Sequence, residues 1–336
     1  MTMPLPVLKC LDARIPKWNF DALNERVCPF CGNGNAPMLV RPDQLPVAFC
    51  DTCGCWYVAN VPHESELSRI YDSYFSTHRP TTLSAHLGIS MIKNALEASQ
   101  SDWQLQILSR ALGGLNNKYI VDVGCGVGRF LVMAKAQGAD VVGCDLSPEA
   151  CEFAQNHLGI VVHCKTLQEC APSVGRVDAV IMRDLIEHPL EPMATVEAAY
   201  EMLKPGGCLL IHTPNGGGGG DRSCDSALEW VGFRVDLEHL QYLSPQTINW
   251  LSQKHNMRIE RLEAFGFPGL KGIEKLPSFA NKSSKAVHLI KQVAGKIPGM
   301  RETAKILRTI KNEITGDKPR DSRLGSSHLF AILRRT

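Results

Sequence analysis

Short hydrophobic runs alternate with helix-length amphipathic segments over the middle and the end of the chain. The runs are rich in β-branched residues, and the segments between them repeat apolar residues at spacings of three and four. This rhythm is typical of a parallel sheet with helices on both faces. It predicts strands at residues 119–123, 141–144, 161–163, 179–182, 208–212, 258–264 and 328–333.

Other stretches of the chain break this rhythm. The first 62 residues are rich in Pro, Cys and Gly, whereas residues 63–115 have a helical pattern. A Lys-rich excursion at residues 268–325 is too long for a plain loop in a compact domain, so we expect it to contain helices. Five glycines at 216–220 predict a mobile loop without regular structure. We therefore expect an N-terminal domain (1–62), a helical cap (63–115) and a large domain (116–336) that carries a basic insertion.

A glycine-rich turn follows the first strand of the large domain, in the run Y-I-V-D-V-G-C-G-V-G-R-F that begins at Tyr119. Glycines let the backbone turn sharply and bring helix N–H groups close to a ligand. The spacing G-x-G-x-G differs from the G-x-G-x-x-G of dinucleotide sites. Asp145 ends the next strand, where a carboxylate can accept both hydroxyls of a ribose. The pattern predicts an adenosine-containing ligand; the alternative is an ordinary turn with a solvated Asp.

Four ordered motifs resemble those of class I methyltransferases. They are V-D-V-G-C-G-V-G-R-F, G-C-D-L-S-P-E-A, V-D-A-V-I-M-R-D-L-I-E-H-P-L-E-P, which resembles the ubiquinone-biosynthesis-like branch, and M-L-K-P-G-G-C-L-L-I-H-T-P-N. The resemblance covers residues 120–266 and implies an α/β, Rossmann-like seven-stranded fold with S-adenosylmethionine as methyl donor. Thr166 stands where the family often has Asp or Asn near adenine. The cofactor residues that it implies are Asp122, Gly124, Gly126, Gly128, Asp145, Leu146, Thr166, Leu167 and Arg183.

Two C-x-x-C-G knuckles, Cys28–Cys31 and Cys50–Cys53, are separated by 18 residues. Four thiolates at this spacing suit tetrahedral zinc, and four protein ligands leave no open position, so we expect a structural Zn²⁺ in a zinc-ribbon-like domain. The alternatives are unrelated buried cysteines or a redox pair, although no thioredoxin-like βαβ pattern surrounds either knuckle. The region also resembles the zinc-bearing N-terminal part of some bacterial sugar and polysaccharide methyltransferases.

The acid–base candidates follow the fourth predicted strand. Glu187 and His188 resemble a familiar pair of the family, and Asp184 lies just before them. A neutral imidazole can take one proton near pH 7, so His188 is the preferred general base; the alternative is that it only caps a turn. His239 lies where such enzymes cover the acceptor, and it either contacts the acceptor or is structural. Tyr71 and Tyr74 are further candidates, for closing over the cofactor, with a core role as the alternative.

Charge is unevenly distributed, although the net charge is only +2. The segment from Lys271 to Thr336 holds 15 Lys and Arg against 5 Asp and Glu. This balance predicts an anionic partner. The basic residues interleave with aliphatic rather than aromatic ones, which favours an anionic membrane surface or a lipid-linked substrate over nucleic acid.

These patterns together predict a methyltransferase for a small-molecule acceptor such as a sugar, glycolipid or natural-product intermediate. The alternative is a nucleic-acid-binding or RNA-modifying methyltransferase that uses the zinc ribbon and the basic region. Thirteen cysteines fit a reducing compartment, and we find neither a signal peptide nor an apolar run of membrane-spanning length. We expect a cytoplasmic protein with peripheral contact at the inner membrane surface, and we make no prediction about oligomeric state.

Overall fold

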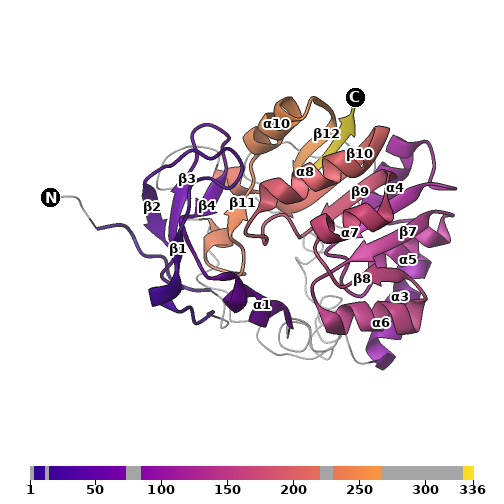
Figure 1. Cartoon of the computed structure of the whole chain (residues 1–336), viewed down its shortest axis with the longest axis horizontal. Helices are drawn as coiled ribbons and strands as arrows, with labels where there is room; N and C mark the ends of the chain where they lie inside the picture. Colours follow the sequence, from indigo (N-terminus) through magenta and orange to yellow (C-terminus); the bar gives the residue numbers. More distant parts are fainter. Residues whose placement is uncertain (1–3, 12–14, 73–84, 220–229, 266–327) are drawn as a thin grey trace, which may run out of the picture. The chain divides into compact units, whose positions relative to one another are not determined.

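The computed structural model describes residues 4–11, 15–72, 85–219, 230–265 and 328–336 of the chain (Figure 1). All of them belong to one compact unit, which comprises Met1–Gly269 and Asp321–Thr336. The predicted basic insertion at 268–325 lies outside the described residues, as does Tyr74. None of the helices in the described part has the length and apolar character that crossing a lipid bilayer requires.

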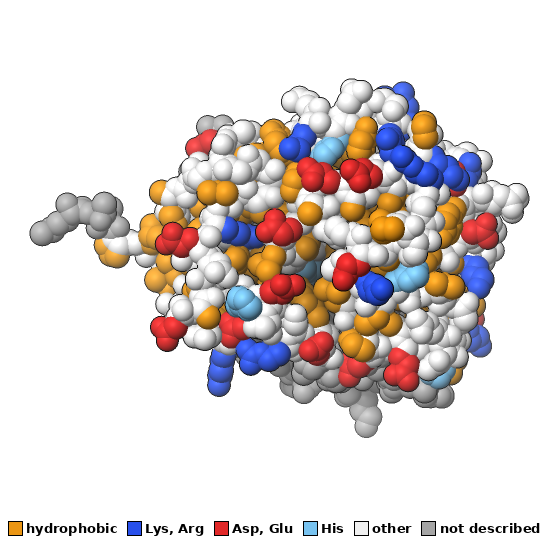
Figure 2. Space-filling model, viewed as in Figure 1, with side chains coloured by type: hydrophobic (Ala, Val, Ile, Leu, Met, Phe, Trp, Pro, Cys, Tyr) orange, Lys and Arg blue, Asp and Glu red, His pale blue; other side chains and the backbone are white. Residues whose placement is uncertain are grey.

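The surface that can be described carries both signs of charge. Of the cations in the basic C-terminal segment, only Arg334 and Arg335 lie in the described part, and both are engaged. Arg334 bonds to Glu260, whereas Arg335 donates to backbone carbonyls and lies over the ring of Tyr200. Acidic side chains are spread over the face drawn in Figure 2, and basic ones gather toward its upper right edge. The predicted anionic partner of residues 268–325 therefore stays a prediction.

A seven-stranded sheet organises the large domain. Its order is β12-β13-β10-β9-β6-β7-β8 (Figure 1). All neighbours pair in parallel from β10 to β8, whereas β13 pairs antiparallel with both β10 and β12. This arrangement confirms the predicted fold class and all seven predicted strands. The strands are β6 (Tyr119–Val123), β7 (Asp140–Cys144), β8 (Val161–His163), β9 (Val177–Arg183), β10 (Leu203–Pro214), β12 (Met257–Phe265) and β13 (His328–Arg335).

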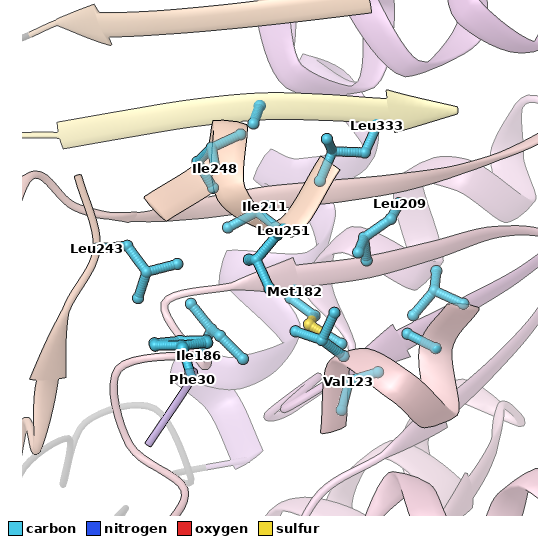
Figure 3. Packing of buried hydrophobic residues seen from close by; sticks show 14 of the residues in the cluster. Phe30, Val123, Met182, Ile186, Leu209, Ile211, Leu243, Ile248, Leu251 and Leu333 are labelled. Carbon is cyan, nitrogen blue, oxygen red and sulfur yellow. The ribbon is translucent and has the colours of Figure 1, made fainter. Parts of the chain in front are cut away.

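Helices cover both faces of this sheet. Apolar residues of α3 (Ala85–Ala98), α4 (Trp103–Leu112) and α5 (Arg129–Ala136) join one buried cluster, and α6 (Pro148–Leu158) packs beside α5. The opposite cluster contains residues of α7 (Leu167–Val174), α8 (Pro192–Met202) and α10 (Pro245–Lys254). Within β9, Ile181 belongs to the first cluster and Met182 to the second (Figure 3). Burial on both faces explains why β9 and the second half of β10 read as nearly continuous apolar runs.

The start of α6 is determined by its own residues. Ser147 is the N-cap, its side chain accepts the N–H of Ala150, and Pro148 occupies the first turn. A serine cap followed by proline is a strong helix start, because the serine oxygen satisfies a free N–H and proline already has a helical φ. The chain therefore turns into a helix directly after β7, which keeps Asp145 at the carboxyl end of that strand.

The N-terminal module, defined as residues 15–62, is built from short antiparallel strands. It contains η1 (Phe20–Ala22), β1 (Asn24–Glu25), β2 (Pro37–Val40), β3 (Pro46–Phe49), β4 (Trp56–Val58) and β5 (Asn60–Val61), and α1 (Glu64–Asp72) follows it. Its larger sheet has the order β11-β4-β3-β2. Because β11 (Gln241–Tyr242) comes from the large domain, the sheet crosses the domain boundary that we placed at residue 62.

The glycine run corrects one expectation. In the described part of the run, Gly216–Gly219 form a short 3₁₀ helix (η2) rather than a loop without regular structure. The N–H of Gly216 donates to the carbonyl of Leu243 at 2.7 Å, and a Cβ on Gly216 would lie 2.6 Å from the carbonyl oxygen of Tyr242. The missing side chain thus permits close contact between backbones. A second 3₁₀ helix, η3, spans Val231–Phe233.

Candidate functional site

The glycine turn and Asp145 meet at the carboxyl edge of the sheet. Gly124, Gly126 and Gly128 all have left-handed φ values, of 69°, 52° and 81°. One Asp145 carboxylate oxygen accepts the N–H of Gly126 at 2.7 Å, and the other accepts the N–H of Ser147 at 2.9 Å. The two segments are adjacent because β6 and β7 are parallel neighbours. The carboxyl ends of the strands are where open α/β sheets bind nucleotide-like ligands.

Gly124 also touches the turn that follows β9. A Cβ on Gly124 would lie 2.8 Å from Cδ1 of Leu185, closer than two such carbons approach. Together with the left-handed φ, this contact excludes other residues without rearrangement. The glycine turn and the turn that carries Glu187 and His188 are therefore in van der Waals contact.

Two further charged residues lie behind the glycine turn. Asp122 is buried, and burial raises its pKa to about 7, an effect that the nearby Arg183 opposes. The guanidinium carbon of Arg183 lies 4.8 Å from the centre of the Phe130 ring. Burial also raises the pKa of Asp145, against the hydrogen bonds from Ser147 and Gly126. Two carboxyl groups with raised pKa values therefore lie at the glycine turn.

The remaining predicted cofactor residues differ in exposure. Leu146 is 48% exposed directly beside Asp145, where it is free to contact a ligand. Thr166 caps α7: its hydroxyl accepts the N–H of Glu169 and donates to the Glu169 carboxylate. Leu167 is buried in the core cluster. The predicted contact of Thr166 and Leu167 with an adenine ring stays a prediction.

A compact group of side chains beside the glycine turn consists of Glu187, His188 and His239. Their ligand-type atoms all lie within 4.8 Å of one another. The rings of His188 and His239 are 4.7 Å apart, centre to centre, and nearly perpendicular. Glu187 is fully buried and accepts a hydrogen bond from the Thr213 hydroxyl at 2.9 Å. The fold thus brings together the three residues that the sequence proposed as acid–base groups.

Burial shifts the pKa of each member of this group toward its neutral form. It raises the pKa of Glu187 well above the usual value, an effect that the charge of Asp184 reinforces. It lowers the pKa of His188 to about 4 and that of His239 well below its usual value. The group is therefore suited to donating and accepting hydrogen bonds and protons.

The surroundings of this group include residues that the sequence analysis missed. The Nδ1 atom of His212 lies 3.0 Å from Asp184, whose φ of 50° is unusual for a non-glycine residue. Thr213, next in the chain, bonds to Glu187 as described above. The run I-H-T-P-N at the end of the fifth predicted strand was the available signal. Tyr71 was expected, and its ring lies 6.2 Å from that of His188.

The four cysteines of the knuckles lie together in the N-terminal module. The Sγ atoms of Cys28 and Cys53 are 3.4 Å apart, those of Cys31 and Cys50 are 3.3 Å apart, and all four lie within 4.8 Å. Four sulfurs at about 2.3 Å from a tetrahedral zinc would be about 3.8 Å apart, so the cluster has the right size.

The two knuckles also have the same backbone geometry. In each, the N–H of the glycine after the second cysteine donates to the carbonyl of the first, at 2.9 Å for Gly32 and 2.7 Å for Gly54. Both glycines have left-handed φ values, of 77° and 71°.

Comparison with known proteins agrees with the motifs. Residues 97–262 match the family model of a methyltransferase domain. The ubiquinone biosynthesis O-methyltransferase of Alkalilimnicola ehrlichii is 34% identical over 118 residues, which cover 33% of this chain and 48% of that protein. The protein of the same name from Escherichia coli O9:H4 is 30% identical over 149 residues, covering 43% of this chain and 58% of that protein. The chain thus spans about half the length of these curated relatives.

Solved structures are similar at low identity. A methyltransferase from Archaeoglobus fulgidus is 18% identical with a TM-score of 0.42, covering 68% of this chain and 91% of that one. The magnesium protoporphyrin IX methyltransferase of Synechocystis is 14% identical with a TM-score of 0.43, covering 80% and 97%. The ordered motifs, the seven-stranded sheet and the matching family model lead to one conclusion. The chain contains a class I S-adenosylmethionine-dependent methyltransferase domain, which the family model matches over residues 97–262.

Proposed function

We propose that this chain transfers a methyl group to a small-molecule acceptor, in the class of sugars, glycolipids or natural-product intermediates. The observation that carries the proposal is the contact between Gly124 and Leu185. It joins a cradle suited to an adenosyl group to a turn that bears acid–base side chains. A donor and an acceptor bound on either side of this contact would be held close enough to react.

The cradle fits the donor in shape and chemistry. The left-handed glycines keep side chains out of the cradle, and the carboxylate of Asp145 retains lone pairs for the two ribose hydroxyls. When bound, S-adenosylmethionine supplies an electrophilic methyl group. The chain's part is then to hold the ribose through Asp145, to align the acceptor and to accept one proton.

The acid–base group supports this last role. His188 and His239 are neutral at pH 7 because of their lowered pKa values, so each can accept a proton or a hydrogen bond from an acceptor hydroxyl. We propose His188 as the base and His239 as its partner. The curated relatives are named as O-methyltransferases, so hydroxyl acceptors are the first class to test.

We further propose that the four cysteines hold one structural Zn²⁺. The distances between their sulfurs and the matched knuckle geometry support this assignment. With four thiolates around it, the ion has no position for an acceptor. Its role would be to hold the N-terminal module folded.

Calorimetry of zinc-replete protein with S-adenosylmethionine and S-adenosylhomocysteine tests the donor site. We expect both to bind, and failure of both would end the proposal. Transfer of labelled methyl to phenolic, sugar and lipid-linked hydroxyl acceptors then tests the acceptor class. Anionic vesicles in a parallel series separate a lipid-linked acceptor from membrane contact through residues 268–325, and RNA tests the nucleic-acid alternative.

The base is tested by His188→Gln. If His188 takes the proton, this change lowers the transfer rate by about 100-fold or more while S-adenosylhomocysteine binds as before. The matched control is His157→Gln on the exposed side of α6. If His188 only caps its turn, the variant loses stability and its transfer rate stays near that of the wild type.

A further inference from the structure

The segment that carries His239 is held by the N-terminal module. We define residues 237–242 as the acceptor-side segment. Its last two residues form β11 and pair with β4, where Gln241 lies opposite Tyr57 and Tyr242 lies opposite Trp56. The backbone N–H of Val58 also donates to the carbonyl of Leu240 at 2.9 Å. The segment is therefore an edge strand of the module's sheet, although it belongs to the large domain in sequence.

One buried arginine strengthens this junction. Arg41 follows β2 and has no exposed surface. Its guanidinium bonds to both carboxylate oxygens of Asp43, to the carbonyls of Leu237 and His239, and to the hydroxyl of Tyr242 at 3.0 Å. These bonds use all five N–H groups of the guanidinium. Three of the five acceptors belong to the acceptor-side segment, and one of them is the backbone of His239.

The same segment holds the turn that carries His188. The side-chain amide of Gln241 donates to the carbonyls of Ile186 and Pro189, at 2.8 and 2.9 Å, on either side of His188 in sequence. The oxygen of that amide accepts a bond from Arg26 of the N-terminal module at 3.2 Å. A continuous set of buried and part-buried hydrogen bonds therefore runs from the module, through the acceptor-side segment, to the backbone of His239 and to the turn that carries His188.

We propose that the N-terminal module positions the His188–His239 pair, and that Arg41 is the positioning residue through which it does so. A fully buried guanidinium with five partners has one permitted geometry, and a planar fork cannot be replaced by an ammonium group. The module is thus part of the catalytic architecture. The geometric part of this proposal stands without the proposed function, whereas its catalytic consequence rests on it.

Arg41→Lys separates geometry from charge. Lysine keeps the positive charge but offers three donors for five acceptors, so the acceptor-side segment is no longer held in one position. The charge of Arg41 lowers the pKa of His239, and this electrostatic effect persists in the lysine variant. A change in the environment of His239 in this variant therefore reports a change in its position.

The measurement is side-chain NMR of the zinc-replete full chain with ¹⁵N-labelled histidine, titrated with pH, with His188→Gln and His239→Gln to assign the two rings. We expect both wild-type rings to stay neutral through mildly acidic pH. In Arg41→Lys, we expect their midpoints to rise toward the unperturbed value of about 6.5. The charged and titratable groups that face the two rings are Asp184, Glu187, Arg41, Tyr71 and Tyr242.

Leu105→Ala provides the matched control. Leu105 is fully buried in α4, in a core cluster that does not include the module, so its loss destabilises the protein elsewhere. We expect the midpoints of both rings to stay at their wild-type values in this variant. Unchanged midpoints in Arg41→Lys, or equal rises in both variants, would overturn the proposal.

Two additions keep the test decisive. If Arg41→Lys does not fold, the isosteric Asp43→Asn replaces it, since Asp43 fixes the guanidinium without contacting either histidine; the same outcomes apply. The affinity for S-adenosylhomocysteine should stay at the wild-type value in the folded variant. Absence of that binding in the wild type would overturn the proposed function, and the ring midpoints would still decide the present proposal.

Discussion

Replacement of Asp145 by Asn tests the cofactor cradle most directly. The side chain accepts two backbone hydrogen bonds, from Gly126 at 2.7 Å and Ser147 at 2.9 Å, through different oxygens. In Asp145→Asn one oxygen becomes an amide nitrogen, which can no longer accept. The shape is preserved, but a donor now faces either a backbone N–H or a ribose hydroxyl.

The expected magnitude follows from the hydrogen bonds lost. A hydrogen bond to a charged group contributes about 1.5–3 kcal/mol, and the variant loses one such bond to the ligand. Because about 1.4 kcal/mol corresponds to a tenfold change in affinity, the Kd should rise by about 10- to 140-fold. The Kd should rise rather than fall because the ribose loses a hydrogen-bond acceptor, whichever molecule receives the methyl group.

Isothermal titration calorimetry with S-adenosylhomocysteine measures this change. Asp140→Asn is the control, since Asp140 is an exposed carboxylate at the start of the same strand, β7. The control should bind as the wild type does. A wild-type Kd in Asp145→Asn would refute the assignment of the ribose to this carboxylate, and an equal loss in both variants would refute a specific role.

Three other changes have distinct expected outcomes. Gly124→Ala should lower the free energy of unfolding by about 1–2 kcal/mol because of its left-handed φ alone, and by more because of the clash with Leu185. Gly113 has a φ of 70° and open space around it, so Gly113→Ala isolates the cost of the left-handed φ in chemical denaturation. Cys50→Ser should remove bound zinc, measured by elemental analysis, and lower the melting temperature sharply, because the binding of structural zinc supplies about 10–16 kcal/mol of free energy in zinc-finger peptides. Retention of one zinc per chain would contradict the site. The control, Cys10→Ser, should change neither quantity. Glu187 has a raised pKa in the folded state, so wild-type stability should fall as pH rises above the usual carboxyl pKa of 4.5, where the unfolded state ionises first. Glu187→Gln should flatten this slope above about pH 4.5, and an unchanged slope would show that Glu187 is not its source.

Much of the fold was predictable from local patterns in the sequence. The seven strands were predictable because a strand buried on both faces reads as an apolar run, and the start of α6 because Ser147 and Pro148 are sufficient to begin a helix. The glycine turn and Asp145 were predictable for a related reason. Parallel neighbours end at the same edge, so two adjacent strands place their following residues together. The spacing within the two C-x-x-C knuckles predicted that the four cysteines lie together.

Tertiary packing alone decided the rest. Arg41 and His239 are 198 residues apart in sequence, and nothing local marks them as partners. The addition of β11 to the N-terminal sheet, against the predicted boundary at residue 62, depends on an edge strand being available in space. The glycines at 216–219 looked like a flexible loop, yet their role is set by the approach of Tyr242.

The protonation states of the acid–base group also depend on tertiary packing. The pattern E-H at 187–188 identified candidates, but the shifts of their pKa values toward the neutral forms arise from burial in the folded protein. The sequence by itself determined which strands, turns and cysteines the protein has, since these depend on near neighbours. Which side chains come into contact, and in which protonation state, depends on packing, because desolvation and long-range hydrogen bonds exist only once the elements have packed.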